Sequence, residues 1–202
     1  MSEQVRSANV RGYRMTRRAE QVEETRQRIV DAAVEVHGTL GPSAGSISAI
    51  AERAGVTRLT VYRHFPDDEA LFAACSAHWL AGQHPPDPAA WAAIDDPARR
   101  LETGLTDLYR FYRDGQPMLT NIYRDKAALP AGSRSGLEAN DAAIADLLAA
   151  PFDGAAERRR LVRALVGHAT SFWTWRSLCV DHDLTQAQAV AAMTDLVLRS
   201  GR

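Results

Sequence analysis

The chain has 202 residues, 46% of them hydrophobic and 24% charged, with a formal net charge of -1 at pH 7, which suits one substantial core or a small domain followed by a larger one. Its two cysteines form no C-x-x-C pair, so the sequence predicts neither a disulfide framework nor a zinc site. Without a long uninterrupted apolar stretch it predicts neither a signal peptide nor a membrane span, and we expect a cytoplasmic protein with no cofactor, metal or membrane partner.

The first 19 residues lack helical periodicity and carry five arginines against one acid, Glu3. They predict a flexible basic arm over residues 1–19, which either follows a DNA backbone or is a solvated tail. Residues 1–66 hold ten arginines against seven acidic residues, a balance of +3, whereas residues 67–202 hold fourteen basic against eighteen acidic residues, a balance of -4. Positive charge therefore gathers in the N-terminal third.

A first helix is predicted from near Glu20 to Gly38, with an apolar face that begins at Val22. The loop after it, GPSAG at residues 41–45, matches G-x-S-x-G, the pattern of a hydrolase nucleophile elbow. Such an elbow requires a strand before the serine, and here a helix precedes it. We therefore interpret the loop as a connection and not as a catalytic site.

The stretch from Gly45 to Phe72 predicts a helix-turn-helix. Ser46 is a suitable N-cap for a helix over residues 47–54, and Gly55 can take the positive φ that ends it. Thr57 then caps a second helix that carries Val61 and Phe65 inward. Such a pair is typical of DNA-binding domains, although an ordinary helix pair in an all-α protein has the same pattern.

The outward face of the second helix carries no acidic residue. Guanidinium groups can bind guanine edges, threonine and leucine can contact thymine methyl groups, and hydroxyl or imidazole groups can bind phosphates. The candidate DNA-binding residues are Ser46, Ser48, Thr57, Arg58, Leu59, Thr60, Tyr62, Arg63 and His64.

The run IAERAGVTRLTVYRHFPDDEALF, residues 50–72, resembles the signature of the tetracycline-repressor (TetR) family of bacterial transcriptional regulators. The resemblance covers residues 20–72, and beyond them only length, helical character and the order of the parts agree. It implies that Arg58 and Leu59 face base edges, that the threonines touch backbone or base, and that Tyr62 and His64 hold phosphates. Asp68 departs from the pattern, because such sequences often carry lysine or arginine there.

After Pro66 we predict a connecting helix over residues 67–84 and a break at the prolines that follow His84. A helical domain is expected over residues 85–202. Its expected segments are 87–94, a longer helix from Pro97 that bends near Gly115, a helix over 136–150 after a loop, and two closing helices over about 155–180 and 185–199.

Aromatic residues at helical spacing fill this second domain, and most of them are expected to be core. A ligand site requires polar groups that converge on a cavity. In the family that the chain resembles, a small molecule bound here changes the spacing of two DNA-binding domains. The candidate ligand-binding residues are His78, Trp79, Tyr109, Tyr112, Tyr123, His168, Phe172 and Arg176.

The segment from Leu161 to Leu178 is apolar around much of its circumference, so it predicts two partners: the domain itself and a second copy of the chain. We expect a homodimer through residues 155–199. The cluster at residues 181–183, Asp-His-Asp, is the nearest to a metal site, but three adjacent side chains diverge and we interpret it as a polar turn.

These patterns together predict an all-α protein with an N-terminal three-helix DNA-binding domain over residues 20–66 and a larger ligand-binding and dimerisation domain. The predicted function is a one-component transcriptional regulator, a repressor that binds a palindromic operator in double-stranded DNA as a dimer and is released by a small-molecule effector. No enzymatic activity is expected. The alternative is an all-α ligand carrier or enzyme that retains a helix-turn-helix shape.

Overall fold

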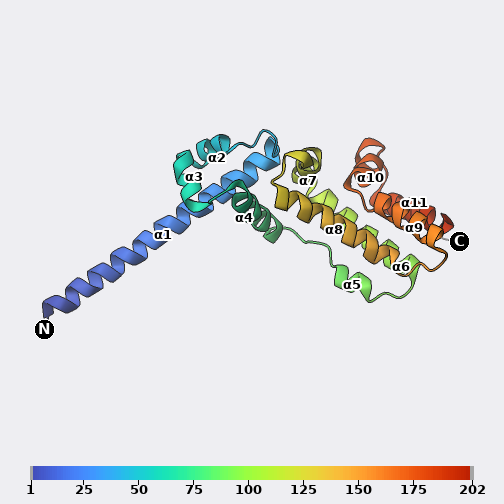
Figure 1. Cartoon of the computed structure of the whole chain (residues 1–202), viewed down its shortest axis with the longest axis horizontal. Helices are drawn as coiled ribbons and strands as arrows, with labels where there is room; N and C mark the ends of the chain where they lie inside the picture. The colour runs from blue at the N-terminus through green and yellow to red at the C-terminus, as the bar shows by residue number, and fades with distance from the viewer. Residues whose placement is uncertain (1, 201–202) are drawn as a thin grey trace.

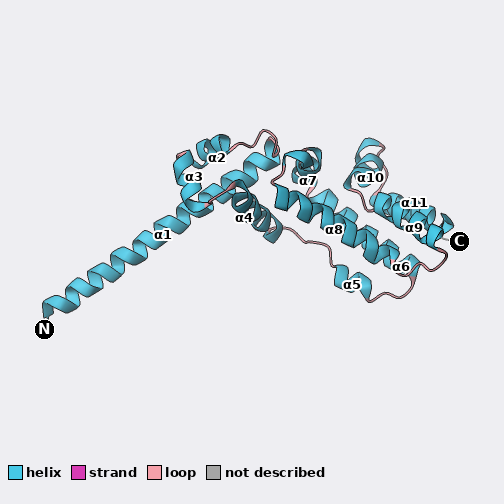
Figure 2. Ribbon diagram, viewed as in Figure 1, coloured by secondary structure: helices cyan, strands magenta, loops and turns pink. Residues whose placement is uncertain are grey.

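The computed structural model describes residues 2–200, and the side chains of residues 16–200. Within that range the chain is helical and contains no strand (Figure 2), as the sequence predicts. The elements are α1 (Ser2–Thr39), α2 (Ile47–Ala54), α3 (Arg58–His64), α4 (Asp68–Ala81), α5 (Pro88–Ala92), α6 (Pro97–Asp114), α7 (Gln116–Arg124), the 3-10 turn η1 (Lys126–Ala128), α8 (Ala131–Ala149), α9 (Ala156–Ala169), α10 (Phe172–Arg176), the π-helical turn η2 (Ser177–Asp181) and α11 (Gln186–Ser200).

The molecule is elongated, with the N-terminus and the C-terminus at opposite ends (Figure 1). Helices α2, α3 and α4 gather around the C-terminal half of α1, and we call α1–α4 the head. Helices α5–α11 form the body. Each part has its own cluster of buried apolar side chains, so two cores stabilise the chain.

The head core packs α1 against α2 and α4, and α2 against α3. Ile29, Ala33, Ile50 and Val61 are buried there, and Leu71 of α4 joins them. At the tight turn Gly55 has φ 66°, its N–H bonds the carbonyl groups that end α2, and its backbone conformation favours glycine. The predicted caps at Ser46, Gly55 and Thr57 are confirmed. The turn sets the angle between α2 and α3.

The body core surrounds α6 and is rich in aromatic residues. The indole nitrogen of Trp91 donates to Asp107 at 3.2 Å. The hydroxyl of Tyr109 donates to the carbonyl oxygen of Ala169 at 2.8 Å. Such partners permit burial of the polar ends of aromatic side chains. The fully buried members include Trp91, Trp175, Tyr109, Phe172, Leu101, Leu105 and Leu108.

The predicted irregular arm is helical in the structure, because α1 begins at Ser2 and not near Glu20. Arginine, glutamate, glutamine, alanine and methionine are good helix formers and are frequent in this part of the sequence. Residues 16–24 are all exposed, Val22 included, and this part of α1 projects away from the other helices (Figure 1). A helix without a packed face needs no apolar periodicity, so the pattern could not reveal it.

Two further predictions were wrong in the body. The helix expected over residues 155–180 is divided into α9, α10 and η2, because Ser171 caps a new helix with its side chain at Trp173 N. Helix α8 begins at Ala131 and not at Gly136, so the expected loop is shorter. A local cap accounts for the first boundary, whereas at the start of α8 the N-cap residue Pro130 makes no side-chain cap bond and the N–H of Gly132 donates to Glu69 of α4.

Candidate DNA interface and ligand cavity

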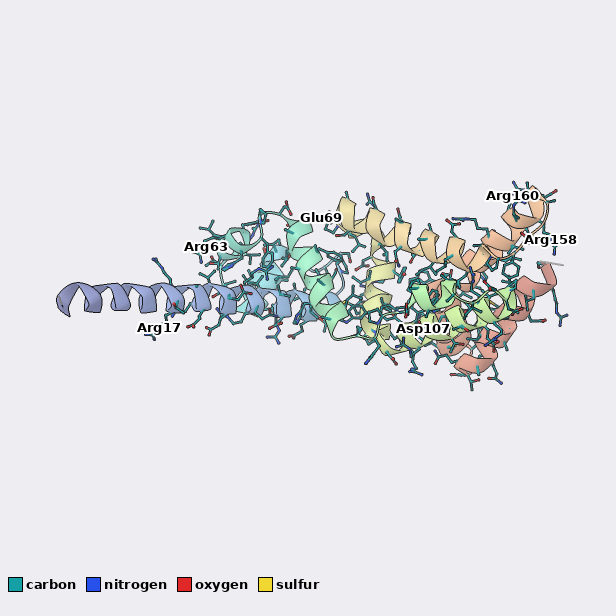
Figure 3. All side chains as sticks on the ribbon, turned by 90° about the horizontal axis from the view of Figure 1, so that it is seen from below. Arg17, Arg63, Glu69, Asp107, Arg158 and Arg160 are labelled. Carbon is teal, nitrogen blue, oxygen red and sulfur yellow. The ribbon has the colours of Figure 1, made fainter. Side chains whose placement is uncertain are left out.

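Helix α3 presents an exposed face on the outside of the head. Leu59 is 79% exposed and Tyr62 is 41% exposed, so the outer face of α3 carries an apolar and an aromatic side chain. Arg58 and Arg63 are exposed beside them, and Figure 3 shows Arg63 at the outer side of the head. Val61 and Phe65 point inward, so the helix has one buried side and one basic, partly apolar side.

Hydroxyl groups at the starts of α2 and α3 hold the turn geometry. The side chain of Ser46 accepts from Ala49 N at 3.3 Å, and Thr57 Oγ1 accepts from Thr60 N at 3.1 Å. The hydroxyl oxygens of Thr57 and Thr60 lie 3.0 Å apart. Ser48 is exposed on the first turn of α2. Ser46 therefore caps α2 and Thr57 caps α3, with the hydroxyl group of Thr60 beside that of Thr57.

His64 lies differently from its neighbours on α3. Its Nε2 atom is enclosed and has no hydrogen-bond partner among the described residues. Burial and the positive charges of Arg63 and Arg26 lower the pKa of the imidazole, so it is neutral near pH 7. Arg26 is also held close, over the ring of Phe65 at 5.0 Å.

A cavity of about 560 Å³ lies where the head meets the body. Helices α1, α4, α6, α7 and α8 contribute its walls, together with the prolines after α4. This volume is in the range of pockets that hold drug-sized ligands. The apolar lining includes Phe72, Trp79, Leu80, Leu108, Phe111, Tyr112, Met118, Leu119, Ile122, Tyr123, Leu129, Leu137 and Ile144.

Three of the eight predicted ligand residues, Trp79, Tyr112 and Tyr123, line this cavity. The other five lie outside it. Their side chains have partners elsewhere: His78 Nε2 pairs with Asp31 at 3.1 Å, Tyr109 bonds Ala169, His168 contacts Thr174, Phe172 is stacked on Tyr123 within the core, and Arg176 pairs with Asp181 at 3.5 Å.

Sequence reasoning missed the polar side chains of the cavity. His37 comes from the last turn of α1, Cys75 from α4 and Asp141 from α8. Burial lowers the pKa of His37 and raises the pKa of Cys75 to about 12, so both are uncharged near pH 7. A signal for Asp141 exists: it interrupts the spacing of Leu137, Ile144 and Leu148 on one helical stripe.

The same region holds the contacts between head and body. Asn121 of α7 donates through Nδ2 to the carbonyl oxygens of His37 at 3.1 Å and Gly38 at 2.8 Å. Asp125 Oδ2 accepts from the backbone N–H of Ser43 at 3.1 Å and from its hydroxyl at 2.6 Å. Arg124 and Ser43 hold the pKa of Asp125 well below its usual range. We call this set the α7 contact.

A second contact joins α4 to α8. The carboxylate of Glu69 accepts from the backbone N–H of Gly132 at 2.9 Å and from the hydroxyl of Ser133. Figure 3 shows Glu69 at the start of α4, beside the first turn of α8. Ser133 also lines the cavity. Both contacts therefore border the cavity wall, and a molecule inside it touches the elements that position the head.

Neither of the two sites considered for catalysis or metal is present in the described residues. Ser43 of the G-x-S-x-G loop follows a helix and donates to Asp125, whose pKa is held well below its usual range, so this carboxylate is too weak a base to activate the serine. No group of three or more His, Cys, Asp or Glu side chains is arranged to hold a metal in residues 16–200. Asp183 has φ 56°, as expected of the polar turn predicted at residues 181–183.

Residues 29–75, which make most of the head, match the model of the bacterial regulatory proteins of the tetR family. The head is therefore similar to the N-terminal DNA-binding domain of the tetR family. The HTH-type transcriptional regulator SrpR of Pseudomonas putida is 55% identical over 47 residues, which are 23% of this chain and 22% of SrpR. The regulator AcrR of Shigella flexneri is 44% identical over 59 residues, 29% of this chain and 27% of AcrR.

The fold beyond this tetR-family domain also has counterparts. A TetR family transcriptional regulator, PfmR from Thermus thermophilus, superposes with a TM-score of 0.58 at 20% identity, over 85% of this chain and 97% of that one. A transcriptional regulator from Rhodococcus sp. Rha1 gives 0.53 at 18% identity, over 86% and 96%. At these identities the likeness concerns the fold. Within the described range, no helix is long and apolar enough to cross a bilayer.

Proposed function

We propose that this chain is a sequence-specific transcriptional regulator that reads DNA with the exposed face of α3. The observation that carries the proposal is the exposure of Leu59 and Tyr62 between Arg58 and Arg63, on a helix whose other side is buried in a tetR-family domain. Water-exposed apolar groups flanked by guanidinium groups suit thymine methyl groups, guanine edges and phosphates of the major groove.

In this proposal the side chains have different tasks. Arg58 and Leu59 read bases, while Arg63 and Tyr62 hold phosphates at the edge of the groove. Thr57 and Thr60 orient the start of α3 and contact the backbone, and Ser46 and Ser48 border it from α2. His64 joins the phosphate contacts after its ring turns outward, which the enclosed position of Nε2 requires in the DNA-free chain.

The body supplies a surface for a second copy. Leu161 of α9 is 49% exposed, and Trp173 of α10 and Leu196 of α11 are exposed as well. Helix α9 packs on α8 and α11 with its opposite side. We infer a two-fold dimer through residues 155–199, which places two α3 helices on the half-sites of an inverted repeat.

The cavity suggests how DNA binding is regulated. Its walls carry His37 at the end of α1 and Ser133 beside Glu69, so a bound molecule changes the contacts that orient the head. We infer that a small effector binds the DNA-free arrangement more tightly and lowers operator affinity, which makes the regulator a repressor released by its ligand. A role in catalysis has no support from the described side chains.

Selection of bound duplexes from a random DNA pool tests the proposal. The expected result is an inverted repeat whose half-sites lie about 10 base pairs apart, or slightly more. A pool that stays random after successive rounds, at salt concentrations where the protein still binds DNA, would show that α3 reads no sequence.

A further inference from the structure

The described lining of the cavity contains a carboxylate and no lysine or arginine side chain. Asp141 is the acidic residue of the lining. His37 and Cys75 also line the cavity, and His37 Nδ1 lies 3.5 Å from Cys75 Sγ. Both side chains are uncharged near pH 7. An ionised Asp141 therefore gives the interior a net negative charge.

Asp141 is held with one oxygen free for a ligand. The hydroxyl of Tyr123 donates to Asp141 Oδ1 at 3.0 Å, and no described residue donates to Oδ2. The positive charge of Lys126 in η1 lowers the pKa of Asp141. The Nζ atom of Lys126 pairs with Glu138 at 3.2 Å. Glu138 thus compensates the charge of Lys126, and the charge of Asp141 remains for a ligand.

Aromatic rings line the same cavity as this carboxylate. Trp79 and Phe111 meet edge to face with centroids 5.9 Å apart, and Tyr112 and Tyr123 line the same cavity. The electron-rich faces of such rings attract an organic cation, most strongly when water is excluded. An anionic head group finds no positive partner among these lining residues and meets a like charge.

We propose that the cavity binds a lipophilic organic cation, with its ammonium group paired with Asp141 and its apolar part among Trp79, Phe111, Tyr112 and Tyr123. The inference rests on the proposed effector site and names the class of effector. Neutral molecules of the same shape bind through apolar contacts alone and therefore more weakly. Carboxylates bind most weakly, because they must enter beside Asp141.

Protonation of Asp141 gives this pairing a pH dependence. Burial is the main cause that raises the pKa of Asp141; Glu138 also raises it, whereas the hydroxyl of Tyr123 and the charge of Lys126 lower it. Tyr112 faces it from α6 and stays protonated, because burial raises its pKa. Pairing requires the ionised carboxylate, so affinity for an ammonium group should rise as the pH rises through the pKa of Asp141.

Three probes with one apolar part test the proposal: 2-(1-naphthyl)ethylamine, 2-(1-naphthyl)ethanol and 1-naphthylacetate. Their dissociation constants are measured by calorimetry on the full, DNA-free chain. We expect the amine to bind best and the carboxylate worst. Asp141→Asn should weaken the amine by about ten- to a hundredfold, since a charged hydrogen-bonded partner is lost, remove its pH dependence, and change the alcohol by less than about threefold.

Asp146→Asn is the matched control, because Asp146 lies on the same helix and pairs with Arg163 outside the cavity. It should leave the order of the probes unchanged. If Asp141→Asn does not fold, Tyr123→Phe serves instead: without the hydroxyl that stabilises the carboxylate, the pH at which amine affinity rises should move upward.

Equal or tighter binding of the carboxylate would overturn the inference, as would an amine preference that survives Asp141→Asn, or no binding of any probe. Operator affinity is measured separately with and without the amine. Binding at Asp141 that leaves operator affinity unchanged upholds the cation site and contradicts release by an effector, so the two proposals fail independently.

Discussion

Gly55 and Gly136 show how backbone conformation decides the effect of the same substitution. Neither has an atom within 4 Å of an added Cβ, but Gly55 has φ 66° at the turn between α2 and α3, whereas Gly136 lies inside α8. Space is therefore equal at the two positions, and conformational strain differs.

Gly55→Ala should lower the free energy of unfolding by about 1–2 kcal/mol, because alanine is strained at positive φ. Gly136→Ala should raise it by about 0.5–1 kcal/mol, because alanine loses less conformational entropy in a helix. Urea unfolding of both variants measures the difference. An unchanged or higher free energy of unfolding for Gly55→Ala would mean that the turn does not require glycine.

At Asp68 we expect a negative charge to stabilise the fold and to weaken the affinity for DNA. With Glu69 it lies in the first turn of α4, where a carboxylate gains about 0.3–1 kcal/mol from the helix dipole, and it is exposed directly after α3. The carboxylate of Glu69 accepts a hydrogen bond from Gly132 of α8, but Asp68 has no such partner in the described residues.

Asp68→Lys should tighten binding to any DNA, steepen the log-log salt dependence by about 0.9, and cost about 0.3–1 kcal/mol of stability. Titrations over a range of salt concentrations measure the slope. Asp153→Lys, the same charge change in the exposed loop between α8 and α9, is the control. Equal slopes for the two variants would place Asp68 away from the DNA.

At the scale of elements, the α7 contact joins the end of α1 to the body. Asn121 is buried and gives both amide hydrogens to carbonyl groups at the end of α1. The carbonyl oxygen of His37 also accepts from the backbone N–H of Gly41 at 3.1 Å. The carbonyl group of Gly38 has no such donor, because Pro42 lacks an N–H, so loss of the amide leaves it unsatisfied.

Asn121→Ala should reduce the free energy of unfolding by about 1–3 kcal/mol and reduce the effect of the cavity ligand on operator affinity. Chemical denaturation and operator titrations with and without 2-(1-naphthyl)ethylamine measure the two effects. Thr120→Ala is a matched control, because that hydroxyl bonds Gln116 within the same helix. A full ligand effect in Asn121→Ala would mean that the coupling runs elsewhere, through Glu69 and α8.

Local chemistry made the head predictable. Ser46, Gly55 and Thr57 cap or break helices through interactions with near neighbours, and the structure has each in that role. The cavity depends on α1, α4 and α8 meeting, and their residues are far apart in the sequence. Tyr109 and Phe172 therefore could not be distinguished from Tyr112 and Tyr123 by spacing, and Asp141 was missed among the alanines and leucines of α8.

For the whole molecule, the proposed dimer rests on the exposed apolar residues of the body. Leu161→Glu should convert the protein to a monomer at micromolar concentration, because a carboxylate buried at an interface has no partner. Sedimentation measures this. Val22→Glu is the control, since Val22 is as exposed on the projecting part of α1. A variant at Leu161 that still sediments as a dimer would place the interface on another face.

We propose that the exposed face of α3 reads a base sequence. The most direct measurement sequences the DNA pools selected by the wild type, by Arg58→Ala and by Arg160→Ala, an exposed arginine at the far end of the body (Figure 3). The wild type and Arg160→Ala should select the same inverted repeat. Arg58→Ala should lose preference at one symmetric position of each half-site, worth about 1–3 kcal/mol. An unchanged selected sequence from Arg58→Ala would contradict the claim.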